Sequence, residues 1–216
     1  MLNRIKSVII GGINFYYITT NRKYFIKICK GKEEWMAKEY SNLKKYWNKL
    51  DVENFQLIEP IKYSKKNEFL ATRFIDGKKL ANLLEPKIFN EFGKKLKKFH
   101  EKGFAHSHLE LQDVLYENGK FYLSDVPFFG DWSQLHDLVT IKMSFNMHRL
   151  KSPWNWHKYN ICCKEFFRGY KLEDSLGFKR DYDYSLNVRM NILLMNGVFN
   201  KIKRYIMKLI KKFGLL

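Results

Sequence analysis

The side chains best suited to chemistry in this chain lie between His106 and Asp125. Imidazole titrates at about pH 6.5, so His108 is a candidate general base, and Glu110 could take that role if the loop bends. Asp113 and Asp125 offer the carboxylate oxygens that magnesium prefers as ligands. These residue types are suited to proton transfer and to binding a cation, with ordinary surface turns as the alternative setting for the two aspartates.

The elements around this stretch are predicted from hydrophobic periodicity. Asp125 follows a short apolar strand at residues 121–123, which comes after the turn-forming residues 117–120. A helix is predicted over residues 87–102, and the chain is mostly helical from about residue 131 onward. The loop that carries His108 is thus placed between a helix and a strand hairpin.

The first 75 residues are predicted to form a sheet with one helix. Strands are expected at residues 5–10, 14–20, 24–28, 55–63 and 68–75, and a helix at 32–50. Asp76 and Gly77 then break the pattern. Strands, one helix, more strands and then helices indicate the α+β class.

Lys27 lies in the middle of the apolar strand at residues 24–28. A buried ammonium group without a partner is costly, and we expect Glu39, about two turns into the following helix, to be that partner. Glu33 and Glu34 are alternatives in the same helix. Another interpretation is that Lys27 faces solvent and needs no partner.

Gly11 and Gly12 occupy the turn between the first two predicted strands. Glycines let the backbone approach a phosphate group closely, because no Cβ stands in the way. We therefore treat them as candidate phosphate-binding residues, with an ordinary hairpin turn as the alternative.

The chain is strongly basic, with 40 Lys and Arg residues against 22 Asp and Glu residues and a net charge of +18. This charge indicates an anionic partner, unless the lysines form an ordinary solvated surface. The three cysteines lack the spacing of a disulfide set or a zinc site, so we expect them in the core of a reduced, cytosolic protein. No apolar run is long enough to span a membrane.

The C-terminal residues 198–213 combine an apolar helical face with six Lys and Arg residues. A basic amphipathic helix is typical of binding to an anionic membrane surface. Packing on its own domain and a nucleic-acid arm are alternatives, although few aromatic residues are interleaved for base stacking. We expect peripheral association with the inner face of the plasma membrane and no nucleic-acid partner.

The order of these motifs resembles the protein-kinase-like superfamily and, within it, the small bacterial lipopolysaccharide core heptose kinases. The resemblance covers roughly residues 5–145 and is carried by Lys27, Glu39, the hinge at 74–77, the loop at 106–115, Asp125 and Asp137-Leu138. It implies a two-lobed fold with a minimal helical C-lobe. The implied ranges are an N-lobe at 1–75, a C-lobe at 76–197 and a basic amphipathic helix at 198–216.

The resemblance also implies a role for each matched residue. Lys27, held by Glu39, would position the phosphates of ATP, and Asp125 and Asp113 would hold Mg²⁺. The family pattern has Asp where this chain has His108, and Asn where it has Asp113. Asp113 keeps a hard oxygen ligand, whereas His108 offers a base without the negative charge of an aspartate.

The resemblance predicts an ATP-dependent kinase that phosphorylates a sugar of a lipopolysaccharide core or a similar envelope glycolipid. The segment after Asp125 is too short for a peptide-docking platform, which argues against protein substrates. Because of His108, the alternative is a catalytically impaired pseudokinase that acts as a binding or regulatory module. A basic nucleic-acid-binding protein is a third hypothesis, for which the sequence shows no motif.

Overall fold

The computed structural model describes residues 2–5, 14–29, 31–50, 52–172 and 175–195. The chain divides into two compact units, residues 1–173 and 174–216, and the second contains helix α5 (Ser175–Met195). This division falls inside the range predicted for the C-lobe, and the predicted lobe boundaries stay predictions. In the described part of the chain, no helix has the length and apolar character needed to cross a membrane.

Three predicted features lie outside the described residues. They are most of the strand expected at residues 5–10, the turn with Gly11 and Gly12, and the basic helix at 198–216.

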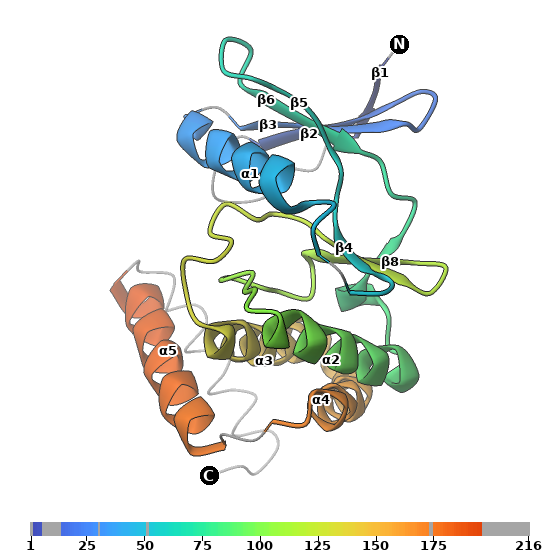
Figure 1. Cartoon of the computed structure of the whole chain (residues 1–216). Coiled ribbons are helices and arrows are strands. Elements are labelled where there is room, and N and C mark those ends of the chain that lie inside the picture. The colour runs from blue at the N-terminus through green and yellow to red at the C-terminus, as the bar shows by residue number, and fades with distance from the viewer. Residues whose placement is uncertain (1, 6–13, 30, 51, 173–174, 196–216) are drawn as a thin grey trace. The chain divides into compact units, whose positions relative to one another are not determined.

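The first unit begins with a five-stranded antiparallel sheet (Figure 1). Its strands in spatial order are β1 (Leu2–Ile5), β2 (Asn14–Thr19), β3 (Tyr24–Cys29), β6 (Phe69–Arg73) and β5 (Pro60–Ser64). Lys27 lies in the central strand β3, opposite Tyr16 of β2 and Leu70 of β6. Pairing on both sides fixes the register of Lys27, and therefore the face of the sheet from which it projects.

Helix α1 (Glu33–Tyr46) packs against β5 and β6. It has two glutamates in its first turn and two lysines in its last turn, which complements the helix dipole. Met36, Glu39 and Leu43 are its buried residues, at the spacing of one helical face. Glu39 thus stands in an otherwise apolar stripe, where a carboxylate needs a partner.

A second sheet contains β4 (Phe55–Leu57), β9 (Lys120–Leu123), β8 (Val114–Glu117) and β7 (Lys78–Lys79), in that order. The prediction of a single strand over residues 55–63 is wrong. Its first part pairs in parallel with β9, and its second part, β5, joins the first sheet. Pro60 at the start of β5 has no N–H to donate, and the β5 ladder is irregular between Pro60 and Lys62.

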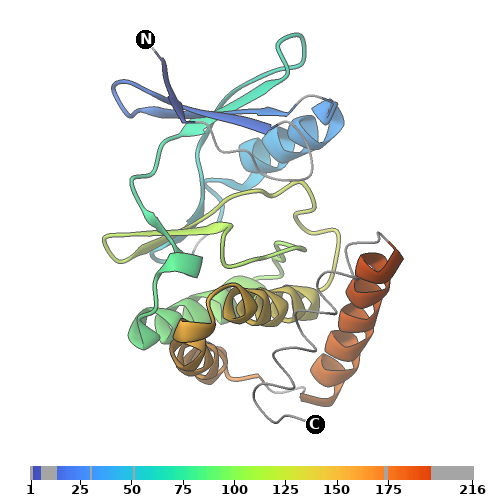
Figure 2. The same ribbon diagram turned by 180° about the vertical axis from the view of Figure 1, so that it is seen from behind.

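Three helices lie beneath the second sheet (Figure 2): α2 (Pro86–Glu101), α3 (Gln134–Lys151) and α4 (Trp156–Tyr170). Helices α2 and α4 cross closely because glycines face each other's backbone. A Cβ at Gly93 would lie 2.2 Å from the carbonyl oxygen of Phe166, and one at Gly169 would lie 2.0 Å from that of Asn90. No larger residue fits at either position without moving a helix.

Phenylalanine rings fill the core between the second sheet and these helices. The fully buried rings are Phe55, Phe89, Phe92, Phe99, Phe121, Phe145 and Phe166. Cys162 and Cys163 are also buried there as free thiols, as expected for these two cysteines. Burial raises the pKa of Cys162 to about 11, so it stays a neutral core thiol at physiological pH.

Candidate active site

Lys27, Glu39 and Asp125 meet at one point, and we call them the phosphate cluster. The Nζ of Lys27 lies 2.9 Å from Oε2 of Glu39 and 2.7 Å from Oδ1 of Asp125. The three residues come from β3, from α1 and from the end of β9. The predicted pairing of Lys27 with Glu39 is present, and Glu33 and Glu34 are not its partners.

Charge compensation sets the protonation of this cluster. Burial alone would lower the pKa of Lys27, but Glu39 and Asp125 raise it above its ordinary value. Partial burial would raise the pKa of Asp125, but Lys27 lowers it. Burial raises the pKa of Glu39 against the opposing effect of Lys27. Lys27 is therefore a firmly charged cation.

The loop between α2 and β8 is fixed from below by α3. Asp137 Oδ2 accepts from the backbone N–H of His106 at 2.7 Å. One turn later Thr140 Oγ1 donates to the carbonyl of Leu109 at 2.9 Å, and Ser144 Oγ accepts from the N–H of Leu111 at 3.1 Å. Asp137, Thr140 and Ser144 lie on one face of α3, so a single rigid helix sets the path of the loop.

His106 and Ser124 connect the loop to the end of β9. The ring Nε2 of His106 donates to the carbonyl of Ser124 at 2.8 Å, and burial lowers the pKa of this imidazole, which keeps it neutral. Ser124 in turn donates from its N–H and its hydroxyl to the carbonyl of Asp113, both at 2.9 Å. His106 and Asp137 thus have structural roles in this loop, and the bonds from Ser124 bring Asp113 next to Asp125.

Asp113 is the buried acid of the site. Its Oδ2 accepts from the N–H of Glu110 at 3.0 Å. Burial raises its pKa well above the ordinary value, and the negative charges of Asp125 and Glu110 raise it further. An aspartate here is costly in the absence of a cation, because three carboxylates share one region.

His108 and Glu110 form a second, more exposed feature, which we call the acceptor pair. Nε2 of His108 lies 3.5 Å from Oε1 of Glu110, with side chains 44% and 22% exposed. Gln112 holds the other oxygen of Glu110 at 2.8 Å. The loop therefore places the carboxylate of Glu110 beside the imidazole of His108.

A row of rings leads outward from the acceptor pair. The rings of His108 and His136 have centroids 6.5 Å apart, and those of His136 and Trp132 are 4.2 Å apart in an edge-to-face arrangement. Trp132 is 54% exposed, and its backbone N–H donates to Oγ of Ser107 at 3.0 Å. An indole edge is thus presented to solvent next to the candidate base.

Two backbone positions of the site are in the left-handed region. Ser107 has φ 73° and Asp125 has φ 57°. Such values cost energy for residues with a Cβ and tend to persist at functional sites, where neighbouring contacts hold them. Here they turn the chain just before His108 and at the carboxylate of the phosphate cluster.

Several supporting residues were not predicted from the sequence. Asn42 on α1 donates to the carbonyls of Val126 and Pro127 at 2.8 and 3.3 Å, which holds the segment after Asp125. Thr140 and Ser144 were missed as loop anchors. Small polar residues in helices have many uses, so no sequence signal singles them out.

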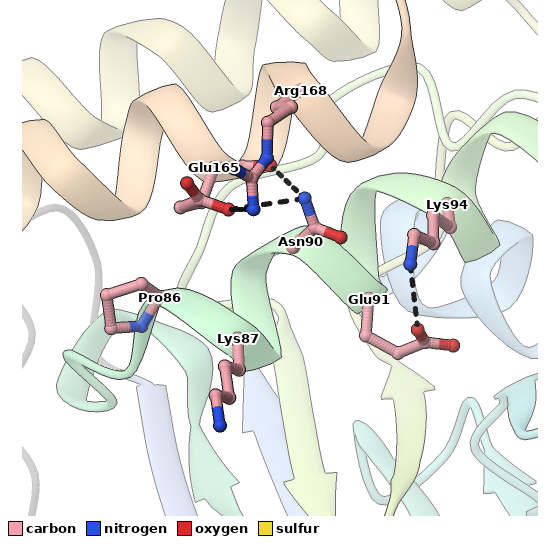
Figure 3. A pocket seen from close by; sticks show the side chains of 7 residues that line it. All are labelled: Pro86, Lys87, Asn90, Glu91, Lys94, Glu165 and Arg168. Carbon is pink, nitrogen blue, oxygen red and sulfur yellow. Dashed lines mark hydrogen bonds and ion pairs between the residues drawn. The ribbon is translucent and has the colours of Figure 1, made fainter.

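An open pocket of about 410 Å³ lies elsewhere, between α2 and α4 (Figure 3). Four of its five charged side chains form pairs: Lys94 lies 3.9 Å from Glu91, and Arg168 lies 2.5 Å from Glu165. The fifth is Lys87. None of the predicted site residues lines the pocket, and we assign it no role.

No family model matches the chain. Among curated proteins, the sequence is similar to the KEOPS complex subunit Bud32 of Pyrococcus abyssi (strain GE5 / Orsay), with 28% identity over 113 residues. The match covers 49% of this chain and 47% of Bud32, so the chain spans about half the length of the curated relative it matches.

Solved structures of phosphotransferases have the same fold. APH(2")-IIa, in a complex with streptomycin and ATP, is 10% identical with a TM-score of 0.60, covering 94% of this chain and 90% of that one. Spectinomycin phosphotransferase APH(9)-Ia, with ADP and spectinomycin, is 14% identical with a TM-score of 0.55, covering 84% and 77%. Amicoumacin kinase hAmiN, with AMP-PNP and Ca²⁺, is 12% identical with a TM-score of 0.54, covering 81% and 73%. The protein therefore has the two-lobed protein-kinase-like fold, as predicted.

Proposed function

We propose that the protein is an ATP- and magnesium-dependent phosphotransferase that phosphorylates a sugar of a lipopolysaccharide core or a similar envelope glycolipid. The observation that carries the proposal is the phosphate cluster: a charged lysine held between Glu39 and Asp125, 2.9 and 2.7 Å from their oxygens. Such a lysine is suited to bind nucleotide phosphates. The nucleotides bound in the three structural neighbours support the same assignment.

The residues around Asp125 fit a magnesium ion. Asp113 and Asp125 supply hard oxygen ligands. The pKa of Asp113 is raised by burial and, to a smaller degree, by the negative charges of Asp125 and Glu110, which a cation would offset. Within the described part of the chain, no three His, Cys, Asp or Glu side chains form a metal site by themselves. This suits Mg²⁺, which typically uses one or two carboxylates together with substrate phosphates. When bound, the ion would neutralise developing charge on the phosphates.

The acceptor pair would receive the sugar hydroxyl. The imidazole of His108 would accept the hydroxyl proton, and Glu110, 3.5 Å away, would hold the ring in place. Lys27 would bind phosphate oxygens and keep the nucleotide in place. Catalysis in this class rests mainly on positioning and charge neutralisation, so the change from Asp to His at this position is compatible with turnover.

Two observations favour a neutral or anionic sugar as the acceptor. The ring row from His108 to Trp132 offers an aromatic surface on which the C–H face of a sugar ring can pack. The net charge of +18 disfavours cationic acceptors and attracts phosphorylated or acidic glycans.

The second candidate function is that of a pseudokinase, a binding or regulatory module. It is favoured by His108 at the position where the kinase-like pattern has Asp. It is also favoured by the ion pair between Lys27 and Asp125, in which each charge compensates the other without a ligand. The two candidates differ in phosphoryl transfer and agree in nucleotide binding.

The test is transfer of labelled γ-phosphate from Mg-ATP to an extracted envelope glycolipid fraction. We expect label in the glycolipid with the wild type and background label with Asp125→Ala. Asp131→Ala is the matched control, because Asp131 is an exposed acid six residues later and pairs only at the surface with Lys38. Nucleotide binding without transfer to any fraction would favour the pseudokinase, and full transfer by Asp125→Ala would refute the site.

A further inference from the structure

The corner where α3 ends and α4 begins carries a group of exposed apolar side chains. Trp154 is 80% exposed, Leu150 is 50% exposed, and Met147 and Trp156 are 44% and 47% exposed. They lie on the last two turns of α3, on the short 3-10 helix Pro153–Asn155 and on the first residue of α4. A cluster of this kind on a folded surface marks an interaction site.

The corner is held rigidly, so the exposure of Trp154 does not come from a loose loop. Arg149 hydrogen-bonds Asn146 and Asn160, and its guanidinium lies 5.2 Å from the ring centroid of Trp156. The ring of His148 stacks on Tyr159 at 5.8 Å. The apolar groups are therefore presented to solvent by a fixed scaffold.

The charge around the corner has one sign. Residues 138–164 contain five Lys and Arg residues and no Asp or Glu. Lys151 and Lys158 are exposed beside the apolar group, as is His157. Burial and the charge of Lys151 lower the pKa of His148, and Glu110 in the loop between α2 and β8 opposes this shift. Glu110 itself accepts a hydrogen bond from Gln112. An exposed apolar centre with cations around it complements the anionic headgroups and upper acyl region of a bilayer.

Other occupants fit this surface less well. Nucleic acid would stack on aromatic faces, but Leu150 and Met147 have no such face, and Arg149 covers that of Trp156. The core of a protein interface is usually depleted in lysine, whereas Lys151 adjoins Leu150 directly. Tryptophan beside lysine is typical of the membrane–water interface.

We propose that the α3–α4 corner, residues 147–158, docks on an anionic lipid bilayer, with Leu150 and Trp154 entering the headgroup region and Lys151 and Lys158 facing the lipid phosphates. The corner is a different part of the sequence from the basic segment 198–216, which lies outside the described residues. The corner is connected to the loop between α2 and β8 through two hydrogen bonds. Tyr159, the residue after the corner, donates to the carbonyl of Ala81 at 3.2 Å, and the N–H of Ala81 donates to the carbonyl of Leu111 at 3.0 Å. Docking here would bring a bilayer-borne acceptor near the acceptor pair.

The test uses the full chain and vesicles of phosphatidylcholine alone or mixed with an equal part of phosphatidylglycerol. We expect the wild type to partition onto the anionic vesicles, and the double variant Leu150→Ser/Trp154→Ser to partition roughly tenfold more weakly, because two inserted apolar groups are lost. Trp35→Ser is the matched control, since Trp35 on α1 is also 54% exposed. We expect its partition to equal that of the wild type.

A second readout separates the corner from the C-terminal segment. Brominated phospholipids quench only tryptophans that enter the bilayer, so Trp154→Phe should remove most of the quenching and Trp35→Phe should remove none. Wild-type partition by the double variant, with unchanged quenching in Trp154→Phe, would overturn the proposal. If the double variant lost binding to a uridine homopolymer while its vesicle partition stayed intact, the corner would be a nucleic-acid site and the proposal would also be overturned. Neither readout requires phosphoryl transfer, so this proposal can fail while the proposed function stands.

Discussion

Lys27 and Glu39 of the phosphate cluster are more deeply buried than His108 of the acceptor pair. In the cluster, Lys27 and Glu39 have side chains only 18% and 7% exposed, and each requires the other, whereas the side chain of Asp125 is 52% exposed. In the acceptor pair, His108 is 44% exposed and its contact with Glu110 is longer, at 3.5 Å. Burial thus fixes the residue types at Lys27 and Glu39 and leaves the type at His108 free to change.

This difference explains where the chain departs from the kinase pattern. A partly exposed position such as that of His108 can change from Asp to His at little cost in stability, because water solvates either side chain. A change at Lys27 or Glu39 would leave a buried charge without a partner. The departure at His108 therefore bears on the chemistry of the acceptor and leaves the fold intact.

The largest expected effect is that of Lys27→Met. The substitution leaves Glu39 buried without its cation and should lower the free energy of unfolding by about 3–5 kcal/mol. It should also abolish nucleotide binding. Denaturant unfolding and titration with a labelled nucleotide measure the two effects.

Two controls sharpen this prediction. The double variant Lys27→Met/Glu39→Leu should recover most of the stability and none of the nucleotide binding, because an apolar pair replaces the ion pair. Lys38→Met removes an ion pair with Asp131 whose side chains are 49% and 36% exposed, and should cost about 0–1 kcal/mol. Equal losses for Lys27→Met and Lys38→Met would remove the distinction between buried and exposed charges.

The next effect concerns the acceptor pair. His108→Gln removes the proton acceptor and should lower the transfer rate by about a hundredfold, within the usual range for a general base. The affinity for nucleotide and the free energy of unfolding should be unchanged, because the side chain is partly exposed. His108→Asp should restore transfer, since a carboxylate can accept the proton. Wild-type turnover by His108→Gln would mean that the pair is not the base.

The fold and the phosphate cluster could be predicted because burial leaves few choices. Lys27 lies in an apolar strand, where a buried ammonium group needs a carboxylate partner, and helical spacing places Glu39 on the buried face of α1. The kinase-like order of motifs supplied the rest, and the α+β class is confirmed. The contact between Lys27 and Asp125 joins residues 98 positions apart, and the order of motifs alone gives no distance between them.

Other features could not be predicted, because they depend on the path of the chain in space. The division of residues 55–63 between two sheets follows from the parallel pairing of β4 with β9, which no local pattern encodes. The anchoring of Leu109 and Leu111 by Thr140 and Ser144 depends on how α3 passes below the loop. The placement of Glu110 beside His108 required the loop to bend, which the sequence raised as a hypothesis.

Asp113 is the exception to the contrast between buried and exposed positions, and it gives the smallest expected effect. It is buried, yet it carries a charge where the kinase pattern has a neutral Asn. Its raised pKa means that the folded state binds the proton more tightly than the unfolded state. Stability should therefore be greatest below the unfolded pKa of about 3.9 and fall as the pH rises toward the folded pKa.

Asp113→Asn should remove this loss, since the amide oxygen can still accept from the N–H of Glu110 and has no charge to desolvate. The variant should match the wild type near about pH 4 and exceed it by on the order of 1 kcal/mol at neutral pH, as measured by urea unfolding across a pH series. Asp76→Asn alters an exposed acid that pairs with Arg22, and its stability relative to the wild type should not increase with pH. Added Mg²⁺ and a non-hydrolysable nucleotide should narrow the gap, because an ion that binds the Asp113–Asp125 pair stabilises the folded wild type. If the gap is instead absent at every pH, Asp113 carries no destabilising charge, and its substitution for Asn gives no support to a metal site.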